Sequence, residues 1–553
     1  MSPTARPTTV FTGGRVFTAT SRVPQDGAVA VAGERILAVG TDAEVLALRG
    51  PGTEVVDLGG GLLVPGFQDT HVHPVLAAGV VDRLDLTSAR TLDDTLRAVR
   101  AYAEAHPDRS WVHGWGWDAD LFEGGRPTRA QLDALVPDRP AVLLRADGHA
   151  AWVNSRAVEA ARLDDGGPAH GPVPDPPGGR IERDAAGRAS GVLQEWATDL
   201  VVALVPTPDA ADRLRHLVAG QEALFGYGIT AWQDASVLAD DAELYAHAAD
   251  TGALSATVVG ALRWDHRRGP EQLEELVARR ASVARERFRP TAVKIMHDGV
   301  IDGSLTAAML EPYLDGHGHT TDNRGESLFD VPTLRRTVAD LTAAGFQVHF
   351  HAIGDRAVRE CLDALAAAGG GRPLATRPIL SHVQVVHPDD VPRFARLGAV
   401  VSAQPLWANG EDVQTELTIP FLGEPRSSWQ YPFGDLVRAG ATLAGGSDWP
   451  VSTPDPLQGI HVAVNRAIRG EDRPPFYPEQ ALGLADALLA YTRGSAVANH
   501  REHESGTIEP GKLADLAVLD RDVFAAPADE IGAARVTQTF VAGRRVWAAE
   551  ESR

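Results

Sequence analysis

Residues 62–74 read Leu-Leu-Val-Pro-Gly-Phe-Gln-Asp-Thr-His-Val-His-Pro. The apolar start predicts a buried strand, and two histidines, His71 and His73, stand at its end. Side chains alternate along a strand, so residues at i and i+2 project from one face and both imidazoles can reach one metal ion, whereas a helix would need i and i+4. The alternative is two ordinary histidines of the surface or core. We interpret His71 and His73 as metal ligands.

Downstream of this stretch, apolar runs bounded by Gly, Asp or His alternate with Ala-, Leu- and Arg-rich stretches of helical character. This alternation is typical of βα units around a parallel sheet. The strand candidates number eight: 62–71, 228–234, 255–262, 291–298, 347–354, 378–384, 399–404 and 442–448. Eight βα units predict an α/β fold with a TIM-type (β/α)8 barrel, whose reactive groups lie at the C-terminal ends of the strands.

Short strand-like runs broken by turn residues occur at both ends of the chain, in residues 9–58 and again in residues 515–547. We expect them to form one composite β-sandwich from residues 1–64 and 503–553, with the barrel domain in residues 65–502. Residues 82–205 are too long for one βα connection and have their own character, with three tryptophans in residues 111–117. They predict an insertion after the first barrel strand.

Composition restricts the classes of function. The formal net charge of −22 argues against nucleic acid or an anionic membrane as a partner, and no apolar run is long enough to span a bilayer. The single cysteine, Cys361, excludes an intramolecular disulfide and a site of several thiolates, so a metal must be held mainly by His and carboxylate. The first ten residues lack the apolar core of a secretion signal, so a cytoplasmic location is expected.

Further ligand types stand at the ends of later strand candidates. His351 and His382 lie near the ends of the fifth and sixth candidates, and Asp448 ends the eighth. A barrel brings such residues together from separate strands. A carboxylate at position 448 can take a proton from a bound water and deliver it to a leaving group, as general base and then general acid. The alternatives are core histidines and a turn aspartate; for His349, a structural role is the preferred interpretation.

Several motifs make the sequence similar to the amidohydrolase superfamily, and to its amidohydrolase-3 branch, which includes N-substituted formamide deformylases. They include His-Ala-Ile-Gly-Asp at 351–355 and Gly-Gly-Ser-Asp-Trp-Pro at 445–450. The matching segments extend over nearly the whole chain: 65–74, 145–150, 228–235, 293–299, 351–358, 381–384, 445–451 and 506–516. The resemblance implies a barrel flanked by a β-sandwich from both termini, and a homodimer is common among such relatives.

The resemblance also implies a role for Lys294. Ordinary lysine has no lone pair to give at neutral pH, but carbamylation by carbon dioxide would create an anionic group whose two oxygens bridge two ions. The implied cofactor is therefore one or two divalent metal ions, with zinc expected, and carbamylated Lys294. The implied ligand set is His71, His73, Lys294, His351, His382 and Asp448. The alternative is a lysine that pairs with Asp298 or another buried carboxylate.

Residues of the substrate pocket have weaker signals. Tryptophans near the strand ends and in the insertion would suit an apolar or aromatic small molecule, although core packing is an equal alternative. An Asp-Gly-His motif of the branch adds two polar candidates, for which a structural turn is the alternative, and His297 could touch substrate or metal or simply fill space. The substrate-binding candidates are Trp115, Trp117, Asp147, His149, His297, Asp298, Gln404 and Trp449.

Together these features predict a metal-dependent hydrolase that cleaves a carbon–nitrogen bond other than a peptide bond, in an amide or an N-substituted formamide. A metal-bound hydroxide would attack the carbonyl, and Asp448 would pass the proton to the leaving nitrogen. One rival is an esterase, lactonase or phosphoesterase that uses the same site. Another is a barrel that binds a small ligand without turnover.

Overall fold

The computed structural model describes residues 6–81, 83–146, 148–164, 173–206 and 209–550. Its contacts divide the chain into two compact units, residues 1–74 with 220–553 and residues 75–219. The domain limits expected from the sequence remain predictions. No helix among the described residues is long and apolar enough to cross a membrane.

An eight-stranded parallel sheet forms the centre of the larger unit and confirms the barrel fold. Neighbouring strands pair in chain order, β8-β15-β16-β17-β18-β19-β20-β21. Their bounds are β8 Phe67–Val72, β15 Ile229–Val237, β16 Thr257–Arg263, β17 Phe288–Met296, β18 Gln347–Ala352, β19 Ile379–His382, β20 Val400–Ala403 and β21 Thr442–Gly445. Each of the eight candidate runs therefore contains barrel-strand residues, because buried parallel strands carry near-continuous apolar sequence.

The seam between β21 and β8 brings the first and last strands of the barrel together. Across it, the Thr70 hydroxyl donates to the carbonyl of Gly445 at 2.9 Å, and the backbone N–H of Asp448 donates to the carbonyl of His71 at 2.7 Å. The seam therefore places residues that are far apart in the sequence, His71 and Asp448, at the same edge of the barrel.

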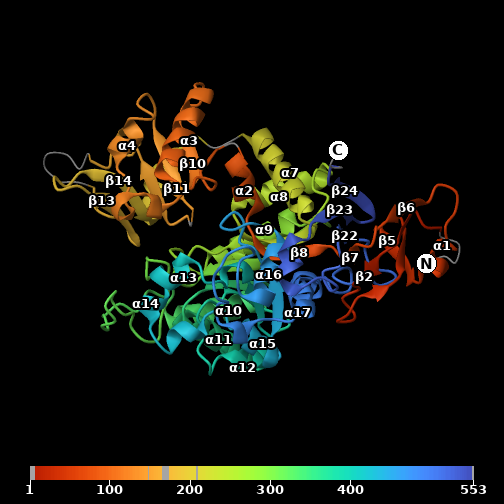
Figure 1. Ribbon diagram of the computed structural model, residues 1–553. Helices are drawn as coiled ribbons and strands as arrows, with labels where there is room; N and C mark the ends of the chain where they lie inside the picture. The colour runs from red at the N-terminus through yellow and green to blue at the C-terminus, as the bar shows by residue number, and fades with distance from the viewer. Residues whose placement is uncertain (1–5, 82, 147, 165–172, 207–208, 551–553) are drawn as a thin grey trace. The chain divides into compact units, whose positions relative to one another are not determined.

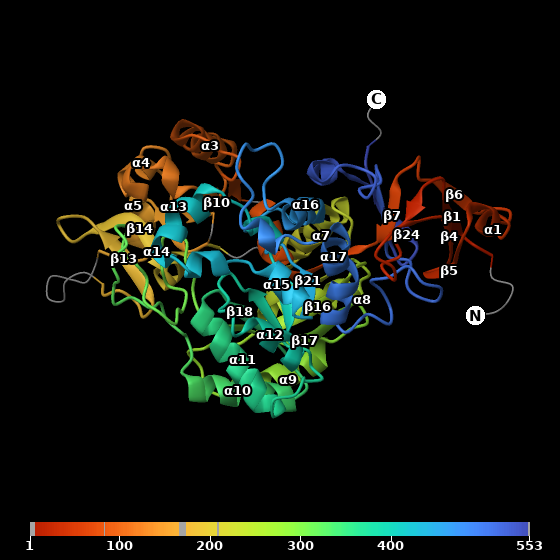
Figure 2. The ribbon, with the colours of Figure 1, turned by 60° about the horizontal axis from the view of Figure 1, so that its bottom comes forward.

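Helices follow the barrel strands, and Figure 2 shows several of them on the outer side of the barrel. The longer ones are α7 Ala210–Gly226, α8 Ala239–Asp250, α9 Gln272–Val283, α10 Val331–Ala343, α11 Asp355–Gly369 and α16 Pro456–Asn465. The side chain of Asp330 caps the start of α10 by accepting from the N–H of Thr333, and α11 ends at Gly370, whose φ of 58° is left-handed. Local sequence thus sets where these helices begin and end.

Strands from both termini share one six-stranded sheet, ordered β24-β23-β22-β7-β2-β3 (Figure 1). It contains β2 Arg15–Val16, β3 Gln25–Asp26, β7 Leu62–Pro65, β22 Leu516–Leu519, β23 Val536–Val541 and β24 Arg544–Ala548. A second sheet, β5-β4-β1-β6, contains β1 Thr9–Thr12, β4 Ala28–Ala32, β5 Arg35–Gly40 and β6 Glu54–Asp57. Phe11 and Phe540 meet edge to face at 4.9 Å in the apolar core between the two sheets, as expected of a sandwich.

Residues 75–219 carry a six-stranded mixed sheet of their own, ordered β13-β14-β12-β11-β10-β9. Its strands are β9 Leu84–Asp85, β10 Val112–Trp117, β11 Ala141–Arg145, β12 Ala150–Val153, β13 Gly179–Arg183 and β14 Ala189–Glu195. Side chains of this sheet belong to two separate apolar clusters. One contains Trp117 and Trp152, and the other contains Val142 and Leu193.

The single strand expected over residues 62–71 is in fact two strands, which is a correction. Gly66 separates β7, which pairs with β22, from β8, which pairs with β15. The backbone N–H of Gly66 still bonds the carbonyl of Asp515 in the sandwich, and that of Phe67 bonds Gly228 in the barrel. An apolar run by itself does not indicate that its strand partner changes midway.

Gly66 is also packed too tightly for a side chain, because an added Cβ would lie 2.3 Å from the Thr230 hydroxyl oxygen. We expect Gly66→Ala to lower the free energy of unfolding by about 1–3 kcal/mol through overpacking. The measurement is equilibrium urea unfolding, with Gly316→Ala as the control, since a Cβ at Gly316 would meet no atom within 4 Å. Equal stability of the two variants would contradict the expectation.

Candidate metal centre

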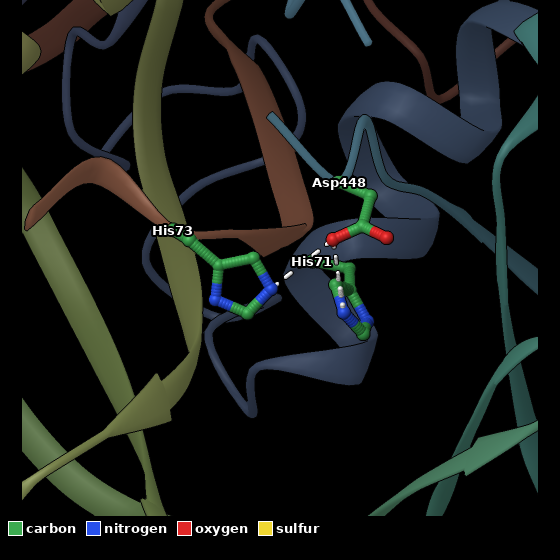
Figure 3. Close-up of side chains that lie close together, drawn as sticks. All are labelled: His71, His73 and Asp448. Atoms are coloured by element: carbon green, nitrogen blue, oxygen red, sulfur yellow. Dashed lines mark ion pairs between the residues drawn. The ribbon is translucent and has the colours of Figure 1, made fainter. Parts of the chain in front are cut away.

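The ends of β8 and β21 bring two histidines and one aspartate together. His71 Nε2 lies 3.5 Å and His73 Nε2 3.1 Å from Asp448 Oδ1, and Figure 3 shows both rings turned toward that carboxylate. One ligand atom from each of the three residues lies within 4.8 Å of the other two. Nitrogen and carboxylate donors arranged in this way can hold a divalent ion.

Backbone hydrogen bonds hold these ligands in place. Asp69 Oδ1 accepts from the N–H groups of His71 at 2.9 Å and Ser447 at 3.2 Å, and the N–H of His73 donates to the carbonyl of Trp449 at 2.9 Å. Burial raises the pKa of Asp69 to about 7, and the hydrogen bonds from Ser447 and His71 oppose that rise. Asp69 is a positioning residue that sequence reasoning missed, although it shares a strand face with His71 by the i, i+2 rule.

Lys294 lies beside the first ligand. Its Nζ is 3.2 Å from His71 Nε2, and the side chain is buried within β17. Burial lowers the pKa of Lys294 to about 7, an effect that the negative charge of Asp448 opposes. Among the described residues no carboxylate forms an ion pair with Lys294 within 4.0 Å, so the alternative of a pair with Asp298 does not describe this geometry.

His382 provides the test of whether the site fits a metal ion. Both of its ring nitrogens are buried and have no hydrogen-bond partner among the described residues. Its Nδ1 lies 4.0 Å from Asp448 Oδ2, and its ring centroid is 4.7 Å from that of His71. Burial lowers the pKa of His382 well below its ordinary value, so the imidazole is neutral and has a lone pair for a metal. The residues present therefore fit a divalent ion.

His351 stands next to His382, with their ring centroids 4.5 Å apart. Its Nε2 lies 3.1 Å from the carbonyl oxygen of Gly299 and 3.7 Å from Asp298 Oδ1. The structure thus gathers all six sequence-predicted ligands at one end of the barrel, where His71, His73 and Asp448 offer ligand atoms within 4.8 Å of one another.

Asp298 and His297 face protein groups in the structure. Asp298 accepts from the backbone N–H groups of Ile353, Gly354 and Ala308 at 2.9–3.0 Å, which ties the segment after β17 to the segment after β18. His297 is fully buried, and its Nε2 lies 2.8 Å from Glu360 Oε2 in α11. Both side chains thus have protein partners, although His297 Nδ1 is buried without a hydrogen-bond partner among the described residues.

The side chain of Gln404 forms a hydrogen bond with the backbone of a candidate ligand, His382. Its Oε1 accepts from the N–H of His382 at 2.9 Å, where the His382 φ of 73° is unusual for a residue with a side chain. Trp407 stacks on the His382 ring with centroids 5.4 Å apart and an interplanar angle of 10°. Gln404 and Trp407 therefore fix the position of His382.

Trp449, another substrate-binding candidate, is partly exposed beside Asp448.

The remaining candidates belong to the 75–219 unit. Trp117 is buried and its indole N–H donates to the carbonyl of Leu143 at 2.8 Å, as a core residue would. Trp115 is also buried. His149 Nδ1 lies 2.9 Å from Glu195 Oε2. Asp147 lies outside the described residues.

A parallel eight-stranded barrel with His and Asp donors at its strand ends has the architecture of the metal-dependent barrel hydrolases. Comparison with known proteins identifies the family: the model of the amidohydrolase family matches residues 54–547, so the chain belongs to that family.

Three relatives are similar over most of their length. A putative amidohydrolase, YtcJ, of Bacillus subtilis is 31% identical over 90% of this chain and 91% of its own. The N-substituted formamide deformylase of Arthrobacter pascens is 30% identical over 93% of this chain and 94% of its own. A crystal structure of an uncharacterized metal-dependent hydrolase from Pyrococcus furiosus has a TM-score of 0.73 and 25% identity, over 93% of this chain and 99% of that chain.

Proposed function

We propose that this protein hydrolyses the C–N bond of a small amide or N-substituted formamide with the help of a divalent metal ion. The observation that carries the proposal is the convergence of His71 Nε2, His73 Nε2 and Asp448 Oδ1 at the C-terminal edge of the barrel. Membership of the amidohydrolase family supports hydrolysis, and the deformylase of Arthrobacter pascens supports the formamide class.

The donor set favours zinc. His71, His73 and Asp448 would hold one ion, with His382 and His351 beside them, and imidazole with carboxylate suits Zn²⁺. A second ion would need a bridging anion, which carbamylated Lys294 would supply. A divalent ion bound here would polarise a carbonyl and favour ionisation of water.

Asp448 is the residue that would move the proton. Its carboxylate would accept a proton from the attacking water and return it to the nitrogen of the departing amine, which must leave as a neutral molecule. The backbone bond from Asp448 to His71 keeps this carboxylate beside the histidines throughout. Trp449, partly exposed next to Asp448, would contact an apolar or aromatic substituent of the substrate.

The test is a substrate panel with matched leaving groups: N-benzylformamide, N-benzylacetamide and benzyl acetate, each assayed with protein loaded with Zn²⁺, Mn²⁺ or no metal. We expect release of benzylamine from the formamide or acetamide, loss of that activity on treatment with a chelator, and its return when metal is restored. Cleavage of the ester alone would overturn the C–N assignment. Bound metal with no turnover on any substrate would favour the ligand-binding barrel.

A further inference from the structure

A row of buried polar side chains extends from His71 through the interior of the barrel, on the side of the ring away from Asp448. His71 Nδ1 lies 2.7 Å from Ser381 Oγ and 3.0 Å from His349 Nε2, and Ser381 Oγ lies 2.6 Å from the same His349 nitrogen. His349 Nδ1 in turn bonds Gln233 Oε1. Each of these side chains is at most 1% exposed, so none can exchange its partner for bulk water.

The contacts of Gln347, at the far end of this row, determine which atom of each side chain donates and which accepts. Gln347 Nε2 lies 2.8 Å from the carbonyl oxygen of Arg377 and 2.7 Å from that of Ala498. Carbonyl oxygens only accept, so the amide nitrogen of Gln347 must face them and its Oε1 must face Gln233. Gln233 Nε2 then donates to Gln347 Oε1 at 3.0 Å and to Asn499 Oδ1 at 3.1 Å, which leaves Gln233 Oε1 as the acceptor for His349.

This direction determines the proton positions on both histidines. At the other end of the row, Lys294 Nζ is a donor 3.2 Å from His71 Nε2, so this ring nitrogen accepts and His71 carries its proton on Nδ1. His349 carries its proton on Nδ1, because it must donate to Gln233, and its Nε2 is left to accept from the Ser381 hydroxyl. The hydroxyl of Ser381 donates to that nitrogen and therefore accepts from His71 Nδ1. His71 consequently holds its proton on Nδ1, and its Nε2 lone pair points toward Asp448 and Lys294.

We infer that Ser381, His349 and Gln233 are positioning residues that hold His71 as the Nδ1–H tautomer, with Nε2 ready for a metal before any metal arrives. This inference rests on the proposed function, in which His71 is a ligand. Metal-bound histidines commonly donate their other ring N–H to such a partner, and loss of the partner typically weakens metal binding by about 10- to 100-fold. In this protein the partners of His71 Nδ1 are the hydroxyl of Ser381 and the imidazole of His349. The side-chain amides of Gln233 and Gln347 orient them through hydrogen bonds.

The first experiment measures zinc affinity by competition with a chromogenic chelator. We expect the double variant Ser381→Ala/His349→Phe to bind Zn²⁺ about 10- to 100-fold more weakly than the wild-type protein. Each single variant should lose less, because the other acceptor still faces His71 Nδ1. The control is Ser495→Ala, a fully buried serine whose hydroxyl donates to the carbonyl of Ala490 at 2.7 Å instead of contacting a histidine. Wild-type affinity in the double variant would overturn the inference.

The second experiment needs no metal and therefore separates this inference from the proposed function. Long-range ¹⁵N–¹H correlation spectra of metal-free, ¹⁵N-histidine-labelled protein report which ring nitrogen carries the proton. Both His71 and His349 should be Nδ1–H tautomers, with His349 assigned by the loss of its signals in His349→Phe. A wild-type protein that binds no zinc would contradict the proposed function alone, whereas a proton on His71 Nε2 would overturn the inference.

Discussion

Replacing Asp448 by asparagine is expected to lower kcat by about 10²- to 10⁴-fold, the usual contribution of a positioned general acid or base. Asparagine keeps the size of the side chain and one carbonyl-type oxygen, but it can neither accept the proton of the attacking water nor return it to the leaving nitrogen. The backbone bond from residue 448 to the His71 carbonyl, at 2.7 Å, does not involve the side chain and should persist. The variant therefore tests the carboxylate without changing the size of the side chain or its backbone hydrogen bond.

The measurement is steady-state release of amine at saturating zinc, with metal content determined on the same samples. Metal content separates proton transfer from ligation, because Asp448 also belongs to the donor group. Asp390→Asn is the control: Asp390 is also buried, but its carboxylate pairs with Arg359 at 2.9 Å and Arg393 at 2.7 Å. The control should keep its kcat while losing stability. A metal-loaded Asp448→Asn protein with wild-type kcat would refute the assigned role.

If carbamylated Lys294 bridges two ions as proposed, replacing Lys294 by methionine is expected to lower kcat/KM by about 10²- to 10³-fold, because the loss of that anion would remove several kcal/mol of charge stabilisation. The same variant should bind one fewer metal ion per chain. Carbamate forms when the neutral amine attacks carbon dioxide and releases one proton, and the pKa of about 7 that burial gives Lys294 makes the neutral amine available near neutral pH. The side chain already lies 3.2 Å from His71 Nε2.

Chemical rescue distinguishes a carbamate from an ordinary buried lysine. Lys294→Ala should regain part of its activity and its second metal ion in the presence of acetate or propionate, since either carboxylate supplies two oxygens in the space of the missing side chain. Wild-type protein prepared in ¹³C-bicarbonate should show a carbamate carbon resonance that Lys294→Met lacks. If methylamine but not acetate restores the alanine variant, then Lys294 acts as an amine and the bridging role is wrong.

The barrel and most of its candidate metal ligands could be predicted from the sequence because both depend on local pattern, whereas the role of Lys294 came only from the family resemblance. Most barrel strands are largely apolar runs of ordinary strand length, and parallel strands buried on both faces show that pattern without help from distant residues. β8 is the exception, because the apolar run before it is β7 of the sandwich and β8 itself reads Phe-Gln-Asp-Thr-His-Val. The His71 and His73 pair is likewise a local signal, since the alternation of side chains along a strand puts both rings on one face. Sequence alone therefore determined which end of the barrel carries the candidate site.

Only the tertiary structure decided which polar residues serve that site and how. Gln404 was a candidate for substrate binding, yet its oxygen accepts from the backbone of His382, and Asp298 is occupied by three backbone N–H groups. Ser381 opens one of the matching segments, 381–384, but the sequence assigned it no role, and only the structure shows its hydroxyl 2.7 Å from Nδ1 of a histidine 310 positions away. The physical reason is that a hydrogen bond depends on distance and direction in space, and these are set when the barrel closes.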